Sequence, residues 1–459
     1  MAFPSTLNEL PNGIAALSLI ADFDRCFLNG FANLDQQHQQ TLNALQRVFT
    51  GTPLQQPLCD SCAAIQRHEF VERHFAVLAA VRAAMQGSLF DTLQQQARSV
   101  LERTEIPEAI AQSEPAQQSD RIQVWLESVR NWLMEIALVG YVRLDASTLI
   151  PFMTTLEQIQ AEPLLMRQAA LLTGFFNELM GQVLLADSST IPIYRWVDLW
   201  TQAMVGALRP TVPYTPKLVS GTLELLGLDL RHHANLVSFT AYGLLTNDAQ
   251  VQLVRVTLSA YKVDAISGDE IWLLFPDAAL LLDALVQNKA LHLKDIPLLP
   301  TGDLLWHGDG QIGGKYNLMK KAAECFAPNI SKVPAPCLVS PSDRHPIQLA
   351  EPIFLSDYTI IQNDGTLTLS WQDAGVLPVA MERISLLSEV TVDAIAHSSQ
   401  LFGLLRFDAG HWAVQPLAVT VQNKVIFTGQ KAAKILKAPP KTSTVATLQE
   451  RASRLLRKR

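Results

Sequence analysis

The residues best suited to metal chemistry lie close together near position 60. Cys59 and Cys62 form a Cys-x-x-Cys motif, and His68 and His74 follow it. Thiolate and imidazole groups are the ligands that zinc prefers in structural sites. These four side chains therefore form a candidate zinc site. Together with the basic C-terminus they support one hypothesis, that of a zinc-stabilised nucleic-acid binder.

The spacing of the two histidines argues against a shared metal ion. If both lie on one helix, the step from His68 to His74 rotates by about 240°, so the imidazoles point about 120° apart. Val71 and Phe75 give the face between them an apolar character. The competing interpretation is a loop that enters a helix, with two reduced cysteines and with both histidines on the helix surface.

A glycine-rich segment, Gly308 to Lys315, is the second candidate for chemistry. It follows the apolar run 304–306 and precedes an expected helix, an arrangement in which backbone N–H groups can approach a phosphate. The segment therefore predicts a loop that binds a phosphate or a nucleotide, with the lysine as counter-charge. Its candidate ligands are Gly308, Gly310, Gly313, Gly314 and Lys315.

This segment departs from the known nucleotide-binding motifs. A Walker-type loop needs a glycine where Asp309 stands, and Ser or Thr where Tyr316 stands. A dinucleotide-binding fold needs a second parallel strand that ends in an acidic residue about 20 residues further on, and residues 335–341 lack it. The competing interpretation is a mobile or hairpin-like glycine loop without a ligand.

Other chemistry-bearing residues form no catalytic motif in this sequence. It contains no Gly-x-Ser-x-Gly and no His-Glu-x-x-His. His232 and His233 are adjacent, so in a strand they would face opposite ways and seldom share a metal ion. The sequence therefore favours a non-catalytic protein. We expect no cofactor, with zinc and a nucleotide as the two alternatives.

Charge is distributed unevenly along the chain. The net charge is -7, but residues 431–459 hold nine of the 36 Lys and Arg and one of the 43 acidic residues, so this tail carries +8 and residues 1–430 carry -15. A basic tail predicts an electrostatic contact with a partner protein, with a nucleic-acid backbone or with its own acidic body. The candidate partner-binding residues are Arg451, Arg454, Arg457, Lys458 and Arg459.

The composition indicates a folded protein that buries much apolar surface. Apolar residues make up 48% of the 459, and charged residues 17%, below the roughly 25% that is typical. No stretch reaches the roughly 18 uncharged apolar residues of a membrane span. The N-terminus lacks the basic segment of a secretion signal. Since five cysteines suit a reducing compartment, we expect a cytoplasmic protein without a membrane span.

Residues 1–210 are expected to form a helical domain, either a bundle or an irregular array. Three segments repeat apolar residues at the three- and four-residue spacing that puts one stripe on a helix: 71–85, 122–136 and 165–183. Asp120 and Gln123 resemble a capping box before the second segment. No strict repeat period is visible.

Residues 211–430 are expected to form an α+β domain with a mainly antiparallel sheet. Turn residues separate strand-like runs at 247–248, 363–365, 408–410 and 422–424. Helices are expected near 277–287 and 316–326, and a proline-rich loop at 327–352. Residues 431–459 are expected to be a basic linker and tail that ends in a short amphipathic helix. The predicted fold class is therefore α+β and multidomain, helical first and β-rich second.

These observations lead to one principal hypothesis about function. The chain is expected to be a non-catalytic scaffold or adaptor subunit of a cytoplasmic multiprotein assembly. Its apolar, weakly charged composition and its eight tryptophans suit surfaces that are buried against other protein subunits, including copies of the same chain. Nucleic acid is expected only at the basic tail. The alternatives are a phosphate-binding enzyme or sensor and the zinc-stabilised nucleic-acid binder.

Overall fold

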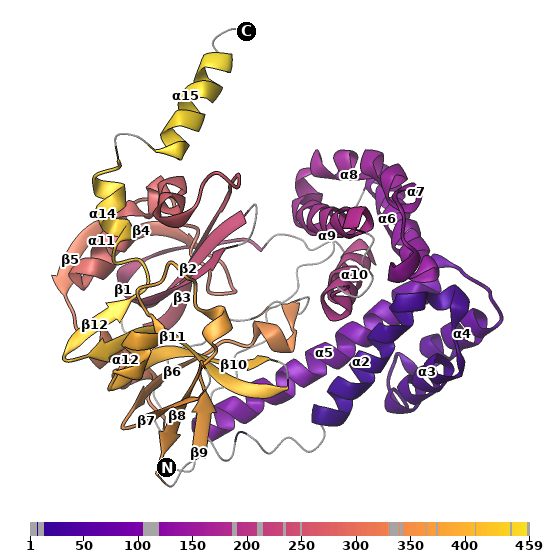
Figure 1. Cartoon of the computed structure of the whole chain (residues 1–459), viewed down its shortest axis with the longest axis horizontal. Helices are drawn as coiled ribbons and strands as arrows, with labels where there is room; N and C mark the ends of the chain where they lie inside the picture. The colour runs from indigo at the N-terminus through magenta and orange to yellow at the C-terminus, as the bar shows by residue number, and fades with distance from the viewer. Residues whose placement is uncertain are drawn as a thin grey trace.

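Helices and strands occupy different halves of the chain, as Figure 1 shows. The computed structural model describes residues 7, 13–103, 119–185, 191–208, 214–232, 236–247, 250–328, 330, 339, 343–363, 365–372, 375–408, 410–440 and 443–456. Within these, the regular structure from 13 to 208 is helical, and the strands lie between 217 and 427. The predicted α+β architecture, helical first and mainly antiparallel second, is confirmed.

The helical half contains the three helices that the apolar stripes predicted, now α5, α6 and α9. Its helices are α2 (Gly13–Asn29), α3 (Gln36–Val48), α4 (Gln55–Gln66), α5 (Glu72–Val100), α6 (Asp120–Val139), α7 (Ala146–Leu149), α8 (Met153–Gln160), α9 (Met166–Leu185) and α10 (Ile193–Leu208). Short 3-10 turns join them: η1 (Phe31–Asn33), η2 (Tyr141–Arg143), η3 (Ile150–Phe152) and η4 (Pro163–Leu165).

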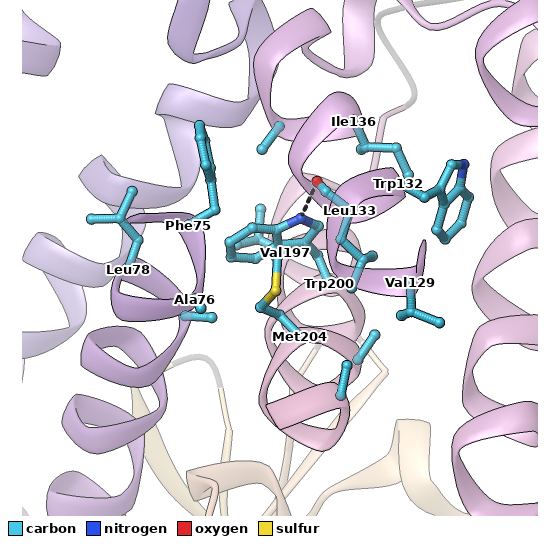
Figure 2. Close-up of a cluster of buried hydrophobic side chains, with 14 of the residues drawn as sticks. Phe75, Ala76, Leu78, Val129, Trp132, Leu133, Ile136, Val197, Trp200 and Met204 are labelled. Atoms are coloured by element: carbon cyan, nitrogen blue, oxygen red, sulfur yellow. Dashed lines mark hydrogen bonds between the residues drawn. The ribbon is translucent and has the colours of Figure 1, made fainter. Parts of the chain in front are cut away.

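Helix α10 lies at the centre of the helical core. Figure 2 shows its side chains between those of α5 and α6. Trp200 of α10 is fully buried, and its Nε1 donates to the carbonyl oxygen of Leu133 at 2.8 Å, so the one polar atom of the indole is satisfied. Phe75 and Met204 belong to the same buried cluster. The tryptophans at helical spacing are therefore core residues here.

Helix α6 has a different cap from the one expected. Ser119 is its N-cap, and the Ser119 side chain accepts a hydrogen bond from the Ile122 N–H at 3.4 Å. Asp120 is the first residue of the helix, where a carboxylate favours the positive end of the helix dipole. The predicted capping box of Asp120 and Gln123 is therefore wrong by one position.

The helical half contains a repeated helix–turn–helix unit that was not expected. Residues 30–35 and 140–145 share the order glycine, aromatic residue, two further residues, leucine and aspartate. In both, the glycine follows a helix with positive φ, the next three residues form a 3-10 turn, and the aspartate caps the following helix. Gly30 and Gly140 lie against each other. The two units therefore meet at their turns.

Helix α5 belongs to both halves of the molecule. Its first part carries Phe75 and Leu78 into the helical core. Its second part carries Phe90 and Leu93 into a separate core that it shares with strand residues such as Leu401. In Figure 1 it runs from the helices to the strands β6 and β9. The hydrophobic cores therefore do not divide at residue 210.

The strand half is built from three antiparallel sheets. The first has the order β3-β2-β1-β4-β5, from β1 (Lys217–His232), β2 (Leu236–Asn247), β3 (Gln250–Tyr261), β4 (Lys289–Leu298) and β5 (Gln311–Lys315). The second has the order β12-β11-β10-β6, from β6 (Glu351–Ser356), β10 (Gln400–Asp408), β11 (His411–Val421) and β12 (Lys424–Phe427). The third is β7 (Thr359–Asn363), β8 (Thr366–Trp371) and β9 (Gly375–Pro378).

Helical segments cover and connect these sheets. They are η6 (Gly268–Leu274), η7 (Pro276–Ala278), α11 (Ala279–Gln287), α12 (Leu318–Phe326), η9 (Pro346–Gln348), η10 (Met381–Arg383), α13 (Val392–Ala396), α14 (Ala432–Lys437) and α15 (Thr444–Leu456). The two helices expected in this half are confirmed as α11 and α12. Much of the expected proline-rich loop, 327–352, lies outside the described residues; its described end carries η9 and the start of β6.

The four expected turns each join antiparallel neighbours. The flanking pairs are Asn247 with Gln250, Asn363 with Thr366, Asp408 with His411 and Val421 with Lys424. In the last turn both central residues, Gln422 and Asn423, have positive φ, as a two-residue type I′ hairpin requires. Residues 248, 364 and 409 of the other turns lie outside the described part of the chain.

The C-terminal residues pack on the strand half before they leave it. Ala432 and Ala433 of α14 are buried in the core of the first sheet, as is Val445 at the start of α15. The Thr444 N–H donates to both carboxylate oxygens of Glu270, at 3.0 and 3.2 Å. Beyond this turn α15 extends away from the strands in Figure 1. None of the described helices has the length and apolar content of a membrane span.

Candidate functional site

A groove of about 1200 Å³ runs between α2 and the second part of α5. The turn at residues 48–54, between α3 and α4, contributes a third wall. Most of its surface is apolar, from Ala15, Leu19, Phe49, Met85 and Leu89. None of the described residues that line the groove is charged. Its chemistry therefore suits contact with an apolar surface.

Uncharged polar side chains follow α5 along the groove. They are Ser88, Thr92, Gln95, Gln96 and Ser99. Their hydroxyl and amide groups can exchange hydrogen bonds with a bound molecule. The described lining therefore offers hydrogen-bonding groups along one wall of an otherwise apolar groove.

Helix α2 carries small or polar side chains at two positions where α6, its counterpart in the repeat, carries tryptophans. When the sequences of the two units are aligned at Gly30 and Gly140, Ala15 is paired with Trp125 and Asp22 with Trp132. Trp132 stacks on Phe152 with ring centroids 3.9 Å apart. Both tryptophans are buried in the second unit, whereas Ala15 lines the groove in the first.

A network of buried charged side chains lies beside the groove. Arg82 of α5 donates to both carboxylate oxygens of Asp24 on α2, at 2.7 and 2.9 Å, and to Asp198 of α10 at 2.5 Å. Arg82 and Asp24 are each only 1% exposed. Because an unpaired charge is very costly inside a protein, these contacts fix the positions of three helices relative to one another.

The same network holds a segment of the strand half. The Nδ1 atom of His345, just before η9, accepts the Ile347 N–H at 3.1 Å. Its Nε2 atom lies 3.1 Å from the Asp198 carboxylate and donates to it. Gln86 of α5 and the Tyr194 hydroxyl also contact Nε2. His345 thus anchors η9 to α5 and α10.

The pKa values of the two carboxylates are shifted in opposite directions. Burial raises the pKa of Asp24 to about 6, even though the Arg82 charge opposes this shift. Burial also acts to raise the pKa of Asp198, but the hydrogen bond from His345 and the Arg82 charge outweigh it and lower the pKa to about 2. Burial raises the pKa of Tyr141 as well. Two such carboxylates can divide acid and base roles, but here they are enclosed, so the network acts as a structural anchor.

The four residues of the expected zinc site do not form a group that holds a metal. Cys59 and Cys62 lie within α4 and not in a loop, and both are free thiols. His68 lies between α4 and α5, and the buried His74 faces the hydroxyl of Ser61 at 3.2 Å. Among the described residues, no three or more His, Cys, Asp or Glu side chains are placed to hold a metal ion. The interpretation of a helix-entry loop is wrong.

The glycine segment precedes helix α12, as expected, but its second part is a strand and not a loop. Residues 311–315, with Gly313, Gly314 and Lys315, are strand β5 and pair with β4. Helix α12 starts after its own N-cap, Asn317, whose side chain accepts the Lys320 N–H at 3.0 Å. The prediction that glycine N–H groups form a loop at a helix start is therefore wrong for residues 311–315. Phosphate binding by Gly308, Gly310 and the strand stays a prediction.

The expected partner-binding tail is partly described. Arg451 and Arg454 are exposed on α15, and Arg454 pairs with Glu450 one turn earlier. Arg457, Lys458 and Arg459 lie outside the described residues. The tail helix is therefore present as expected, with its described cations facing solvent.

The groove and the buried network were not expected from the sequence. The network joins residues from positions 24, 82, 198 and 345, and no local pattern connects them. The repeated motif at 30–35 and 140–145 was the available signal for the groove, because it aligns Ala15 with a tryptophan. Comparison with protein-family models and with curated protein sequences finds no match for this chain.

Proposed function

We propose that this chain is a non-catalytic adaptor subunit that binds partner proteins in the groove between α2 and α5. The observation that supports this role is the groove itself, about 1200 Å³ of mostly apolar wall whose described residues are all uncharged. Soluble proteins seldom leave a large apolar surface open unless another molecule covers it. The adaptor role therefore accounts for the open face.

The shape of the groove suits an amphipathic helix from the partner. Two helices form its long walls, and proteins that recognise helices commonly use such grooves. Met85 adds an adaptable side chain that can pack against different apolar residues. Ser88 and Thr92 offer hydrogen bonds at the edge of the contact. The partner is thus a protein with an exposed apolar helix face.

The compartment and the tail fit the same proposal. Cys26, Cys59, Cys62 and Cys325 are free thiols, as expected in a reducing cytoplasm. Helix α15 adds a cationic contact that can strengthen binding to an acidic partner. We place contact with nucleic acid only at this tail.

A groove-filling substitution tests the proposal. Ala84 is exposed in the groove, so Ala84→Trp fills it, whereas Ala170→Trp puts the same side chain on the exposed surface of α9. We expect a defined set of proteins to co-purify with the wild type and with Ala170→Trp, and to be lost with Ala84→Trp. Circular dichroism and thermal melting show that both variants are folded. Equal recovery of the same proteins by both variants would contradict the proposal.

A further inference from the structure

We infer that helix α15 of a second copy of this chain occupies the groove, so that copies join head to tail. This inference rests on the proposed protein-binding role of the groove and names the first occupant. Three observations carry it: α15 is uncovered, its dimensions and apolar spacing match the groove, and its charge complements the acidic body.

Helix α15 is anchored only at its first turn. Thr444 and Val445 contact the strand half, but the described side chains from Ala446 to Arg454 are all exposed. An isolated helix shorter than about 12–15 residues is marginal in water, because its stability comes mainly from packing. A surface that covers α15 would therefore stabilise it.

The sequence of α15 has the apolar spacing of an amphipathic helix, which can pack one face in a groove. Leu448 is 37% exposed, and in the sequence Ala452, Leu455 and Leu456 continue its three- and four-residue spacing. Arg451 and Arg454 are exposed and lie between these apolar positions in the sequence. One helix thus offers both an apolar stripe and a set of cations.

The groove matches this helix in length. Its lining on α5 runs from Ala84 to Ser99, a rise of about 22 Å at 1.5 Å per residue. Helix α15 has 13 residues and is about 20 Å long by the same measure.

Charge also favours the contact. The described residues that line the groove include no cation, and Arg344 lines the adjoining cavity. Asp22 follows Leu19 by one turn on α2, and Asp91 lies beside Ser88 and Thr92 in an adjoining cavity of about 550 Å³. Their side chains are 41% and 53% exposed, and each has one arginine partner, Arg25 and Arg344. Cations of α15 can join these exposed pairs.

The donor of the helix is a second copy. Figure 1 shows α15 extending from the strand half away from both α2 and α5, and its first turn is held there by Glu270. In the described part of the chain, each copy therefore has one uncovered helix and one groove, which Leu7 contacts at Gln96. Such a contact joins two different surfaces, so it produces either a closed ring or an open chain of copies.

Two variants of the full chain test this assembly by complementation. Leu448→Asp damages the helix and leaves the groove intact, whereas Ala84→Trp blocks the groove and leaves the helix intact. By light scattering, we expect the wild type to associate with increasing concentration and each variant alone to be monomeric. A mixture of the two variants has one good helix and one good groove, so it forms a 1:1 pair. Leu386→Asp and Ala170→Trp, both on exposed positions, keep the association of the wild type.

A synthetic peptide of residues 443–459 measures the contact directly. We expect it to bind the Leu448→Asp protein, to bind at least about tenfold more weakly when the peptide itself carries Leu448→Asp, and to bind more weakly at high salt. A wild type that stays monomeric and a peptide that does not bind would overturn the inference, as would association that persists in both variants. If partner proteins are still lost with Ala84→Trp in that case, the adaptor role stands and self-assembly alone fails.

Discussion

Gly30 and Gly140 lie back to back at the junction of the two helical units. A Cβ atom on Gly140 would lie 2.3 Å from the backbone nitrogen of Gly30, and a Cβ on Gly30 would lie 2.2 Å from the carbonyl oxygen of Leu138. Both glycines also have positive φ, 81° and 83°, which other residues rarely adopt. Each position therefore excludes a side chain for two separate reasons.

The first prediction concerns this junction. Gly140→Ala should lower the free energy of unfolding by at least about 2 kcal/mol more than Gly51→Ala, because it adds a backbone clash to the strain of positive φ. Gly51 is the matched control, since it has φ of +80° but nothing within 4 Å of an added Cβ. Urea denaturation measures both losses. Equal losses in the two variants would show that the contact is unimportant.

The second prediction concerns Asp24 and pH. Its folded pKa of about 6 exceeds the ordinary value of 3.8, so its contribution to stability is present at low pH and is lost as the pH rises from about 4 to about 6. The stability of the wild type relative to Asp24→Asn should fall by about 3 kcal/mol across that range. Denaturation at a series of pH values measures the difference.

Asp198→Asn is the control for this titration. The folded pKa of Asp198 is about 2, below the ordinary 3.8, so its contribution is lost only as the pH falls below about 4. The stability of the wild type relative to this variant should therefore not fall between pH 4 and 6. The same pH dependence in both variants would contradict the opposite shifts assigned to the two carboxylates.

The third prediction concerns the ion pair that ties the end of α5 to the second sheet. Arg103 donates to the Glu351 carboxylate at 2.6 Å and to the Phe326 carbonyl oxygen at 3.3 Å, and both charged side chains are buried. Arg103→Met should cost about 3–5 kcal/mol, because it leaves the Glu351 charge unpaired. The double variant Arg103→Met, Glu351→Gln should recover much of this loss. A double variant that is as unstable as the sum of the single ones would contradict this coupling.

The fourth prediction concerns two buried cysteines, Cys62 of the expected zinc site and Cys26 of α2. Burial raises the pKa of Cys62 to about 11 and that of Cys26 to about 12, so both remain thiols near neutral pH. Iodoacetamide should modify neither in the folded protein and both after denaturation, as read by mass spectrometry. A chelator should not change this protection. Modification of Cys62 after chelation would instead support a bound zinc ion.

The sequence alone predicted the elements whose signal is local. The apolar spacing in α5, α6 and α9 and the turn residues at 422–424 each report on contacts within a few positions, and all were confirmed. The prediction that Cys59 and Cys62 lie in a loop was wrong. Helix α4 begins at Gln55 without a side-chain cap, so no helix-start signal precedes the two cysteines in the sequence.

The features that the sequence did not predict depend on contacts between distant residues. Arg82 stands on a helix whose apolar face looks continuous, and a buried arginine cannot be told from an exposed one until Asp24 and Asp198 are seen beside it. Residues 311–315 were assigned to a loop because their glycines suggested a turn, but pairing with β4 outweighs their weak strand preference. The groove likewise depends on how two helices and a turn are placed.

The length of α5 has a consequence for synthesis of the chain on the ribosome. Phe90 and Leu93 emerge early, but Leu401 and Leu405, which cover them, follow roughly 300 residues later, about 15–60 s at ordinary elongation rates. During that interval the helical half has been synthesised, but the strand residues that pack on the second part of α5 have not. The nascent protein therefore exposes an apolar surface on α5, which a chaperone could bind until the second sheet has been synthesised.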